Sequence, residues 1–366
     1  MRNNQTSKMT ALAMAATFTL GACGGGGGGG SSTPATPAVP ASSSTAATSG
    51  VPPQTSVAAA TYAAGSFQAT AFTLLNNYRN AVGVGLLAQD PVLDQSSQAH
   101  SLYSFTNLST GVMTTLSHDE VVGNANYYAD TPLLRAQKAG APATEWIGEN
   151  IAAGTKQATD AAAAQDCIGQ ALASVYHLAD LLDNQQTVGY GYMPGTTAYP
   201  LYTCTTDFGT STGVVGAPGP NSFSYVGGQQ IATNVVVHSP YTSEAGVALA
   251  MRAESPNPAP DLPAPGRPIL VRVNSENMDI LTVSQFTVTD STGAAVAGRI
   301  LVPTSAKAGS TAATVADPNS ILANGTAVFL PLAPLKANTT YTVTFSGARS
   351  GSALSTPPWS FTTAAS

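Results

Sequence analysis

Charged side chains are scarce in this chain, and their scarcity limits how it can build a surface and a core. Only 9% of its 366 residues are Asp, Glu, Lys or Arg, whereas 43% are hydrophobic. Thr, Ser, Ala and Gly must therefore supply most of the surface. A carboxylate beside an apolar strand, such as Glu149 in EWIGENIAAG, needs partners that offset its desolvation. The length is sufficient for two domains, each with an ordinary core.

The charge balance excludes one class of partner. The formal net charge is -6, and no run of Lys or Arg occurs anywhere in the sequence. Nucleic-acid binding and polybasic membrane contacts both need a basic patch. We therefore expect no nucleic-acid partner.

The N-terminus has the pattern of an export signal over residues 1–22. Arg2 and Lys8 are basic, and residues 9–20 form an apolar segment too short to span a bilayer. The following LGAC resembles a bacterial lipobox, which implies that Cys23 is lipidated and anchors the chain to a membrane. An ordinary cleaved signal that contains a Cys is the alternative. Gly24 after the Cys favours delivery to the outer membrane of a cell with two membranes, so we expect an exported cell-envelope lipoprotein.

The rest of the chain divides by composition. Residues 23–62 are rich in Gly, Ser, Pro, Ala and Thr and predict a disordered tether. Folded domains are predicted over residues 63–210 and 232–366, with a linker over 211–231. Cys167 and Cys204 form an even pair in an exported chain, which predicts a disulfide.

The first predicted domain mixes helical and strand patterns. Apolar residues recur at helical spacing over residues 67–82, and a second helix is expected to begin with Asp90 as N-cap and Pro91 at its first position. A third helix is expected over 160–182. Strands are expected over 147–153, 187–193 and 201–208. This alternation predicts a layered α/β sheet.

The second predicted domain has no helical spacing. Short β-branched or aromatic runs separated by Pro, Gly and Asn occur at residues 235–237, 269–273, 285–289, 296–301, 327–330, 340–346 and 359–363. Alternation over 340–346 places Tyr341, Val343 and Phe345 toward a core. The segment VFLPLAPLKANTTYTVTFSG and the terminal WSFTT resemble bacterial Ig-like repeats. That resemblance implies an all-β sandwich that serves as a spacer or adhesion module.

Five stretches of the first domain resemble the bacterial branch of the CAP superfamily, which includes SCP-like, cysteine-rich secretory, antigen 5 and pathogenesis-related proteins. They are LLNNYRNAVGVGLLAQDPVLDQSSQAH from residue 74, SHDE from 117, GENIA from 148, SVYH from 174 and VGYGY from 188. Ala171 stands where the family usually has Trp, which indicates a divergent member. The resemblance implies an α-β-α sandwich over roughly residues 67–209.

The resemblance also implies a groove lined by two His and two Glu. His118, Glu149 and His177 match three of those positions, and Ser174 occupies the fourth. Two imidazoles and a carboxylate are a plausible ligand set for Zn²⁺, or for another divalent metal such as Ca²⁺. They could equally act as a general base and its partner on a bound water.

A third interpretation needs neither metal nor catalysis. Glu149 could accept hydrogen bonds from His and from backbone N–H groups and so fix the groove, and Asn150 could satisfy a loop backbone. Asp119 and Glu120 are alternatives for a missing acidic ligand. Ser174 with His177 lacks a GxSxG elbow and an obvious third member, which disfavours nucleophilic catalysis. His100 and His238 are expected to be ordinary surface or capping residues.

These observations favour a cell-envelope binding or interaction module whose groove, lined by His118, Glu149, His177, Asn150 and Ser174, captures a lipid, a glycan or a peptide. A metal-dependent, peptidase-like hydrolase that uses the same groove is the alternative, and a purely structural envelope protein is a third hypothesis. The sequence does not decide whether the protein is an enzyme, and binding is favoured over catalysis.

Overall fold

The computed structural model describes residues 50–221 and 226–366, and these described residues form one compact unit. The predicted signal peptide, Cys23 and the tether up to residue 49 lie outside the described residues. The helices are α1 (Phe67–Val82), α2 (Pro91–Ser109), α3 (Pro132–Ala139), α4 (Asp160–Leu172), α5 (Tyr176–Leu181) and α6 (Thr304–Lys307). The strands up to β7 are β1 (Ala88–Gln89), β2 (Trp146–Thr155), β3 (Thr187–Met193), β4 (Leu201–Thr210), β5 (Val236–Ser239), β6 (Ala245–Val247) and β7 (Ile269–Val273). The remaining strands are β8 (Leu281–Asp290), β9 (Gly298–Val302), β10 (Thr314–Ala316), β11 (Thr326–Pro331), β12 (Thr340–Arg349), β13 (Ser352–Ser355) and β14 (Trp359–Thr363).

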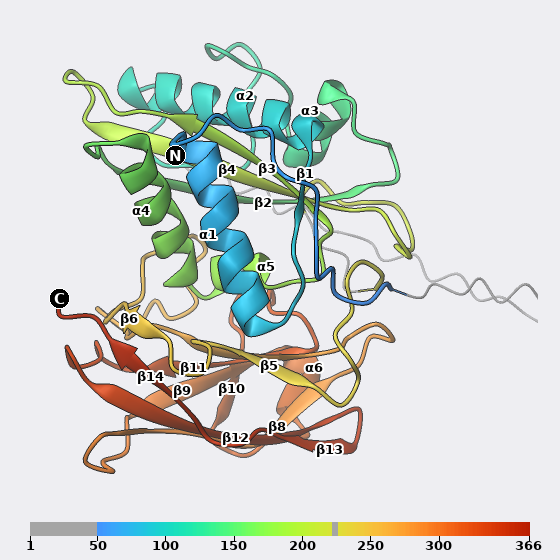
Figure 1. The fold of residues 1–366 in the computed structure, drawn as a ribbon, viewed down its shortest axis with the longest axis vertical. Coiled ribbons are helices and arrows are strands. Elements are labelled where there is room, and N and C mark those ends of the chain that lie inside the picture. The colour runs from blue at the N-terminus through green and yellow to red at the C-terminus, as the bar shows by residue number, and fades with distance from the viewer. Residues whose placement is uncertain (1–49, 222–225) are drawn as a thin grey trace, which may run out of the picture. The chain divides into compact units, whose positions relative to one another are not determined.

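The first sheet has four strands in the order β1-β3-β4-β2, so β2 lies at an edge. Strand β4 is antiparallel to both β2 and β3. Helices α2 and α3 lie on one face of this sheet and α1 and α4 on the other (Figure 1). The α1 and α4 face encloses an apolar core that includes Phe67, Leu75, Ile168, Tyr190 and Phe208.

Two glycines of β3 allow α2 to lie close to the sheet. A Cβ atom on Gly191 would come within 2.0 Å of the carbonyl oxygen of Ser97, and one on Gly189 within 2.2 Å of the backbone of Leu93 and Asp94. The hydroxyl of Ser97 donates to the carbonyl oxygen of Gly189 at 3.2 Å across this contact. The two glycines of VGYGY are therefore required for packing, because a side chain at either position would push α2 away from the sheet.

Local signals explain where the helices begin and end. Asp90 accepts a hydrogen bond from the backbone N–H of Val92 and caps α2, as predicted, with Pro91 in the first turn. The helix predicted over 160–182 is instead two helices. Its break follows from Ser174, whose hydroxyl bonds to the carbonyl of Gln170, and from Glu254, whose carboxylate accepts from the N–H groups of Val175 and Tyr176.

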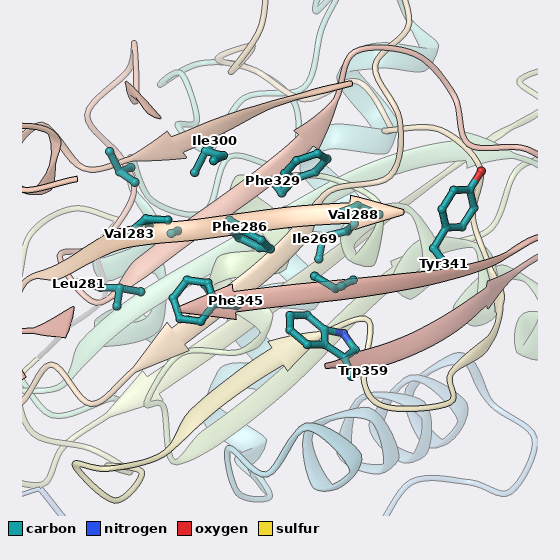
Figure 2. Packing of buried hydrophobic residues seen from close by; sticks show 14 of the residues in the cluster. Ile269, Leu281, Val283, Phe286, Val288, Ile300, Phe329, Tyr341, Phe345 and Trp359 are labelled. Carbon is teal, nitrogen blue, oxygen red and sulfur yellow. The ribbon is translucent and has the colours of Figure 1, made fainter. Parts of the chain in front are cut away.

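The C-terminal strands form two five-stranded sheets. One has the order β10-β9-β11-β7-β5, and the other contains β13, β12, β14 and β6, with β8 also paired to β12. Their facing sides enclose a core that includes Ile269, Phe286, Phe329, Phe345 and Trp359 (Figure 2). The predicted alternation on β12 is confirmed, because Tyr341, Val343 and Phe345 are buried while the intervening Thr side chains are more exposed.

The fold class expected from the sequence, an α-β-α sandwich of the CAP type followed by an all-β Ig-like sandwich, is wrong. Among the described residues strand exceeds helix, at 28% against 21%, and they form three sheets of four to five strands. The physical reason is visible in β7 and β11, in which every residue is buried. A strand buried on both faces needs a partner layer on each side. The second layer here is a cluster in which Leu270 and Val328 pack with Tyr78 and Leu178 from the helices.

The division into domains at residues 211–231 stays a prediction. The predicted disulfide between Cys167 and Cys204 is confirmed, and it joins α4 to β4 across a sequence separation of 37. By the loop-entropy estimate a cross-link of that span stabilises the fold by about 4 kcal/mol. Within the two described ranges, no helix combines the length and the apolar character that crossing a membrane requires.

The close approach of α2 to β3 generates a test. We expect Gly191→Ala to destabilise the protein by about 1–3 kcal/mol, because its methyl group would overlap the backbone of Ser97. Gly169→Ala in α4 is the matched control, since no atom lies within 4 Å of its added Cβ. That control should stabilise by about 0.5–1 kcal/mol through helix propensity. Urea unfolding followed by circular dichroism measures both, and equal effects would contradict the packing argument.

Candidate functional site

The site is built around Glu149 at the edge strand β2. Its side chain is almost fully buried, at 2% exposure, and its Oε1 atom lies 2.9 Å from Nδ1 of His118. His118 comes from the irregular segment between α2 and α3, and its side chain is one-third exposed, at 33%. Because an ionised carboxylate can only accept hydrogen bonds, Nδ1 of His118 donates the hydrogen bond to Glu149. Nε2 is the ring nitrogen that this contact does not use. The sequence-predicted pair His118 and Glu149 is thus in direct contact.

Arg135 holds the same carboxylate from the other side. Its Nη2 atom donates to Oε2 of Glu149 at 2.6 Å, and its Nη1 atom donates to the carbonyl oxygen of His118 at 2.9 Å. Both side chains of the ion pair have 0% exposure. One guanidinium therefore fixes the carboxylate and the loop that carries the imidazole.

A second buried pair lies beside the first. Nδ1 of His100 is 2.9 Å from Oε1 of Glu120, and Nε2 is 3.0 Å from the carbonyl oxygen of Ser117. His100 also lies 3.9 Å from Oε1 of Glu149. The expectation that His100 is a surface or capping residue is wrong, because its side chain has 0% exposure and joins the charged cluster.

Two carboxyl groups on neighbouring strands of the first sheet have opposite pKa shifts. Glu149 on β2 pairs in register with Asp207 on β4. Burial alone would raise the pKa of Glu149, but the charges of Arg135, His100 and His118 outweigh it and hold that pKa well below its ordinary range. Burial, and then the charge of Glu149, raise the pKa of Asp207 well above its usual value. The surroundings therefore favour the ionised form of Glu149 and the neutral form of Asp207.

His177 has a different partner from the one the sequence suggested. Its Nδ1 atom lies 3.4 Å from Oε2 of Glu254, a residue of the C-terminal region. Burial, with a smaller effect of His118, lowers the pKa of His177 to about 4, so the imidazole is neutral near pH 7. Burial raises the pKa of Glu254 to about 7, although backbone N–H groups of residues 175–177 bond to it.

The remaining predicted residues lie around these groups. Asn150 donates from Nδ2 to the carbonyl oxygen of His177 at 3.1 Å. Ser174 bonds to the backbone of Gln170 and not to His177, so no Ser–His pair is formed. Asp119 is exposed at the mouth of a cavity, and Glu120 is directed to His100.

Two adjoining cavities share His118, His177 and Glu254. The larger, of about 830 Å³, also contacts Asn150 and Ser174 and has apolar walls from β2 and α4. The smaller, of about 620 Å³, reaches Glu149 and is bordered by the aromatic side chains Trp146 and Tyr176. All five groove residues predicted from the sequence therefore line at least one of the two cavities.

The predicted metal site stays a prediction. Within residues 50–221 and 226–366, no group of three or more His, Cys, Asp or Glu side chains is arranged to hold an ion. His118 and Glu149 are not arranged as metal ligands, because both oxygens of Glu149 are already hydrogen-bonded, one to His118 and one to Arg135. A Zn²⁺ or Ca²⁺ ion would have to displace one of those partners.

Sequence reasoning missed Arg135, Glu254, His100 and Asp207 as members of the site. Arg135 is one of only 13 Lys and Arg residues in the chain, but the segment PLLRAQKA also contains Lys138, and nothing in the sequence indicates which of the two cations is buried. Glu254 lies in a Pro-rich segment of the region taken to be a spacer, and nothing local marks it as a partner of His177. No model of a known protein family matches the chain, and no curated protein matches it either.

The buried ion pair gives a double-mutant test. Arg135→Met alone leaves the carboxylate of Glu149 buried without its cation, and we expect a loss of about 3–5 kcal/mol of unfolding free energy. Glu149→Gln alone should cost a similar amount, and the double variant should cost less than the sum because neither charge is then left alone. Urea unfolding measures the cycle. Arg299→Met, which breaks the exposed pair with Asp261, is the control and should have a much smaller effect, whereas additive losses would contradict the pairing.

The lowered pKa of Glu149 predicts how stability depends on pH. The folded-state pKa lies below the ordinary value of 4.5, so below that value the unfolded chain binds the extra proton. The contribution of Glu149 is therefore present above 4.5 and is lost as the pH falls through the folded pKa. Urea midpoints measured between about pH 5 and pH 3 should fall less steeply for Glu149→Gln than for the wild type. Parallel slopes would contradict this assignment.

Proposed function

We propose that this protein is an exported cell-envelope lipoprotein that binds a small or extended ligand in the larger cavity. The observation that carries the proposal is the cavity itself, of about 830 Å³, which combines apolar residues of β2 and α4 with polar and charged side chains. Ligand sites are usually concave, mostly apolar and bordered by a small number of polar groups that fix orientation. The signal sequence and Cys23 support export and lipid anchoring, and the envelope, most plainly the outer membrane, is the proposed location.

The condition of Glu149 supports binding over hydrolysis. A general base must be free to accept a proton near the working pH. Both carboxylate oxygens of Glu149 are bonded, to His118 and to Arg135, and its pKa is held below the ordinary range. Glu149 is therefore suited to anchor the wall that carries His118 and poorly suited to take a proton from water.

The motifs that resemble the CAP superfamily support the same proposal at the level of residues. Asn76 and Arg79 of the NNYR stretch, Glu149 and Asn150 of GENIA, and His177 of SVYH each make side-chain or backbone contacts around the cavity or its supporting loops. We propose membership on these motifs alone. A lipid, a glycan or a peptide remains the proposed class of ligand, and the membrane is reached through the lipid at Cys23.

Filling the cavity tests the proposal. Ala152 in β2 lines the larger cavity and is half-buried, so Ala152→Phe should occupy ligand space with little repacking. We expect the neutral apolar dye Nile red to bind the wild type and to bind this variant about tenfold or more weakly. Ala353→Phe on the exposed β13 is the control and should bind the dye as the wild type does. Dye fluorescence titration measures all three.

Two outcomes of that titration would refute the binding function. One is no saturable dye binding by the wild type, and the other is equal binding by wild type and Ala152→Phe. Mass spectrometry of an organic extract of the purified wild type provides a second readout. A co-purified compound that is absent from Ala152→Phe would support the proposal independently of the dye.

A further inference from the structure

The amide oxygen of Asn150 is a buried acceptor that no described group satisfies. Asn150 is 5% exposed and lines the larger cavity, and its Oδ1 atom has no hydrogen-bond partner among the described residues. The orientation of the amide is fixed by its other end, because Nδ2 donates to the carbonyl oxygen of His177 and a flipped amide would place two oxygens together. A buried acceptor without a donor is energetically unfavourable. A ligand with an N–H or O–H group would remove that cost.

The carboxylate of Glu254 lies at the rim of the same cavity without a cation. Its side chain is 1% exposed, and its only ion-pair contact among the described residues is the one to His177 at 3.4 Å. Arg252 also lines the cavity but is 58% exposed and lies nearest to Asp166, at 3.7 Å. The hydrogen bonds that Glu254 accepts all come from backbone N–H groups of residues 175–177.

The two imidazoles at the cavity also favour a ligand that donates hydrogen bonds. His118 directs Nδ1 to Glu149, and His177 directs Nδ1 toward Glu254. Because His177 is neutral near pH 7 and its Nδ1 atom is directed toward Glu254, its Nε2 atom remains available as an acceptor. The rim therefore offers acceptors and, above the pKa of Glu254 of about 7, a negative charge. Ile151 and Ile168 contribute to the apolar walls. This combination matches a ligand that donates hydrogen bonds, carries positive charge and has an apolar body.

We propose that the larger cavity binds amphiphilic primary amines, with the ammonium group donating to Oδ1 of Asn150 and to the carboxylate of Glu254 and the alkyl chain lying along the apolar walls. This inference rests on the binding function proposed above and names the ligand class of the same cavity. An alkyl carboxylate would bring a second negative charge to Glu254. A quaternary ammonium would supply charge but no donor for Asn150.

Four ten-carbon probes separate these possibilities in isothermal titration calorimetry with the full protein. They are decylammonium, decyltrimethylammonium, decanol and decanoate, each used below its micelle concentration. We expect decylammonium to bind about tenfold or more tightly than decanol and decanoate, because a charge-assisted hydrogen bond in a buried site contributes at least that factor. Decyltrimethylammonium should bind more weakly than decylammonium because it cannot donate.

Two variants test the named contacts. Glu254→Gln should abolish the preference for decylammonium over decanol. Asn150→Leu should weaken the binding of both probes, because each can donate to Oδ1, and the loss should be larger for decylammonium because its hydrogen bond is charge-assisted. Asp160→Asn, which makes the same change in net charge at an exposed residue outside the cavity, is the control and should keep the wild-type preference. Circular dichroism checks that each variant is folded. If Glu254→Gln does not fold, the Asn150→Leu result alone tests the proposed amine site.

The outcomes distinguish this inference from the function on which it rests. Decanol or decanoate binding as tightly as decylammonium would overturn the amine preference and leave ligand binding standing. Nile red binding without binding of decylammonium would do the same. Failure of the dye and of all four probes would overturn the proposed function itself.

Discussion

The ion pair between Arg135 and Glu149 is the interaction on which the site depends. It joins α3 to the edge strand β2, and the same guanidinium binds the carbonyl oxygen of His118. Both charges are fully buried, so each is stable there only because the other is present. One guanidinium thus connects α3, the edge strand and the loop that carries His118. The pair therefore determines where the cavity wall lies.

The charges around this pair balance within a small volume. Arg135 pairs with the carboxylate of Glu149, and His100 contacts Glu120, while burial and the charge of Glu149 raise the pKa of Asp207 and so favour its neutral form. A chain with only 9% charged residues concentrates several of them here, away from the surface where charge usually lies. The carboxylate of Glu149 is stable in its apolar surroundings because a guanidinium and an imidazole are its partners.

The sequence predicted much of the local structure and part of the site. Caps and periodicity placed α1, the start of α2, β3, β7 and β14, because those signals are local. The groove residues were predicted from motif order, and His118 does contact Glu149. The partner of His177 could not be predicted, because Glu254 lies 77 residues away in the chain and no local pattern relates the two. Arg135 was missed because one cation in a short helix resembles an ordinary surface residue until its burial is known.

The error in fold class and the missed Glu254 have one physical origin. The segments that form β7 and β11 were predicted only as strands of an all-β sandwich, although strands this rich in apolar residues are typical of burial on both faces. The second face packs against residues of α1 and α5. That packing brings the segment around Glu254 against the start of α5, where its carboxylate bonds to the backbone N–H groups of Val175 and Tyr176. The C-terminal region, expected to be a spacer, therefore contributes a wall and a charge to the cavity.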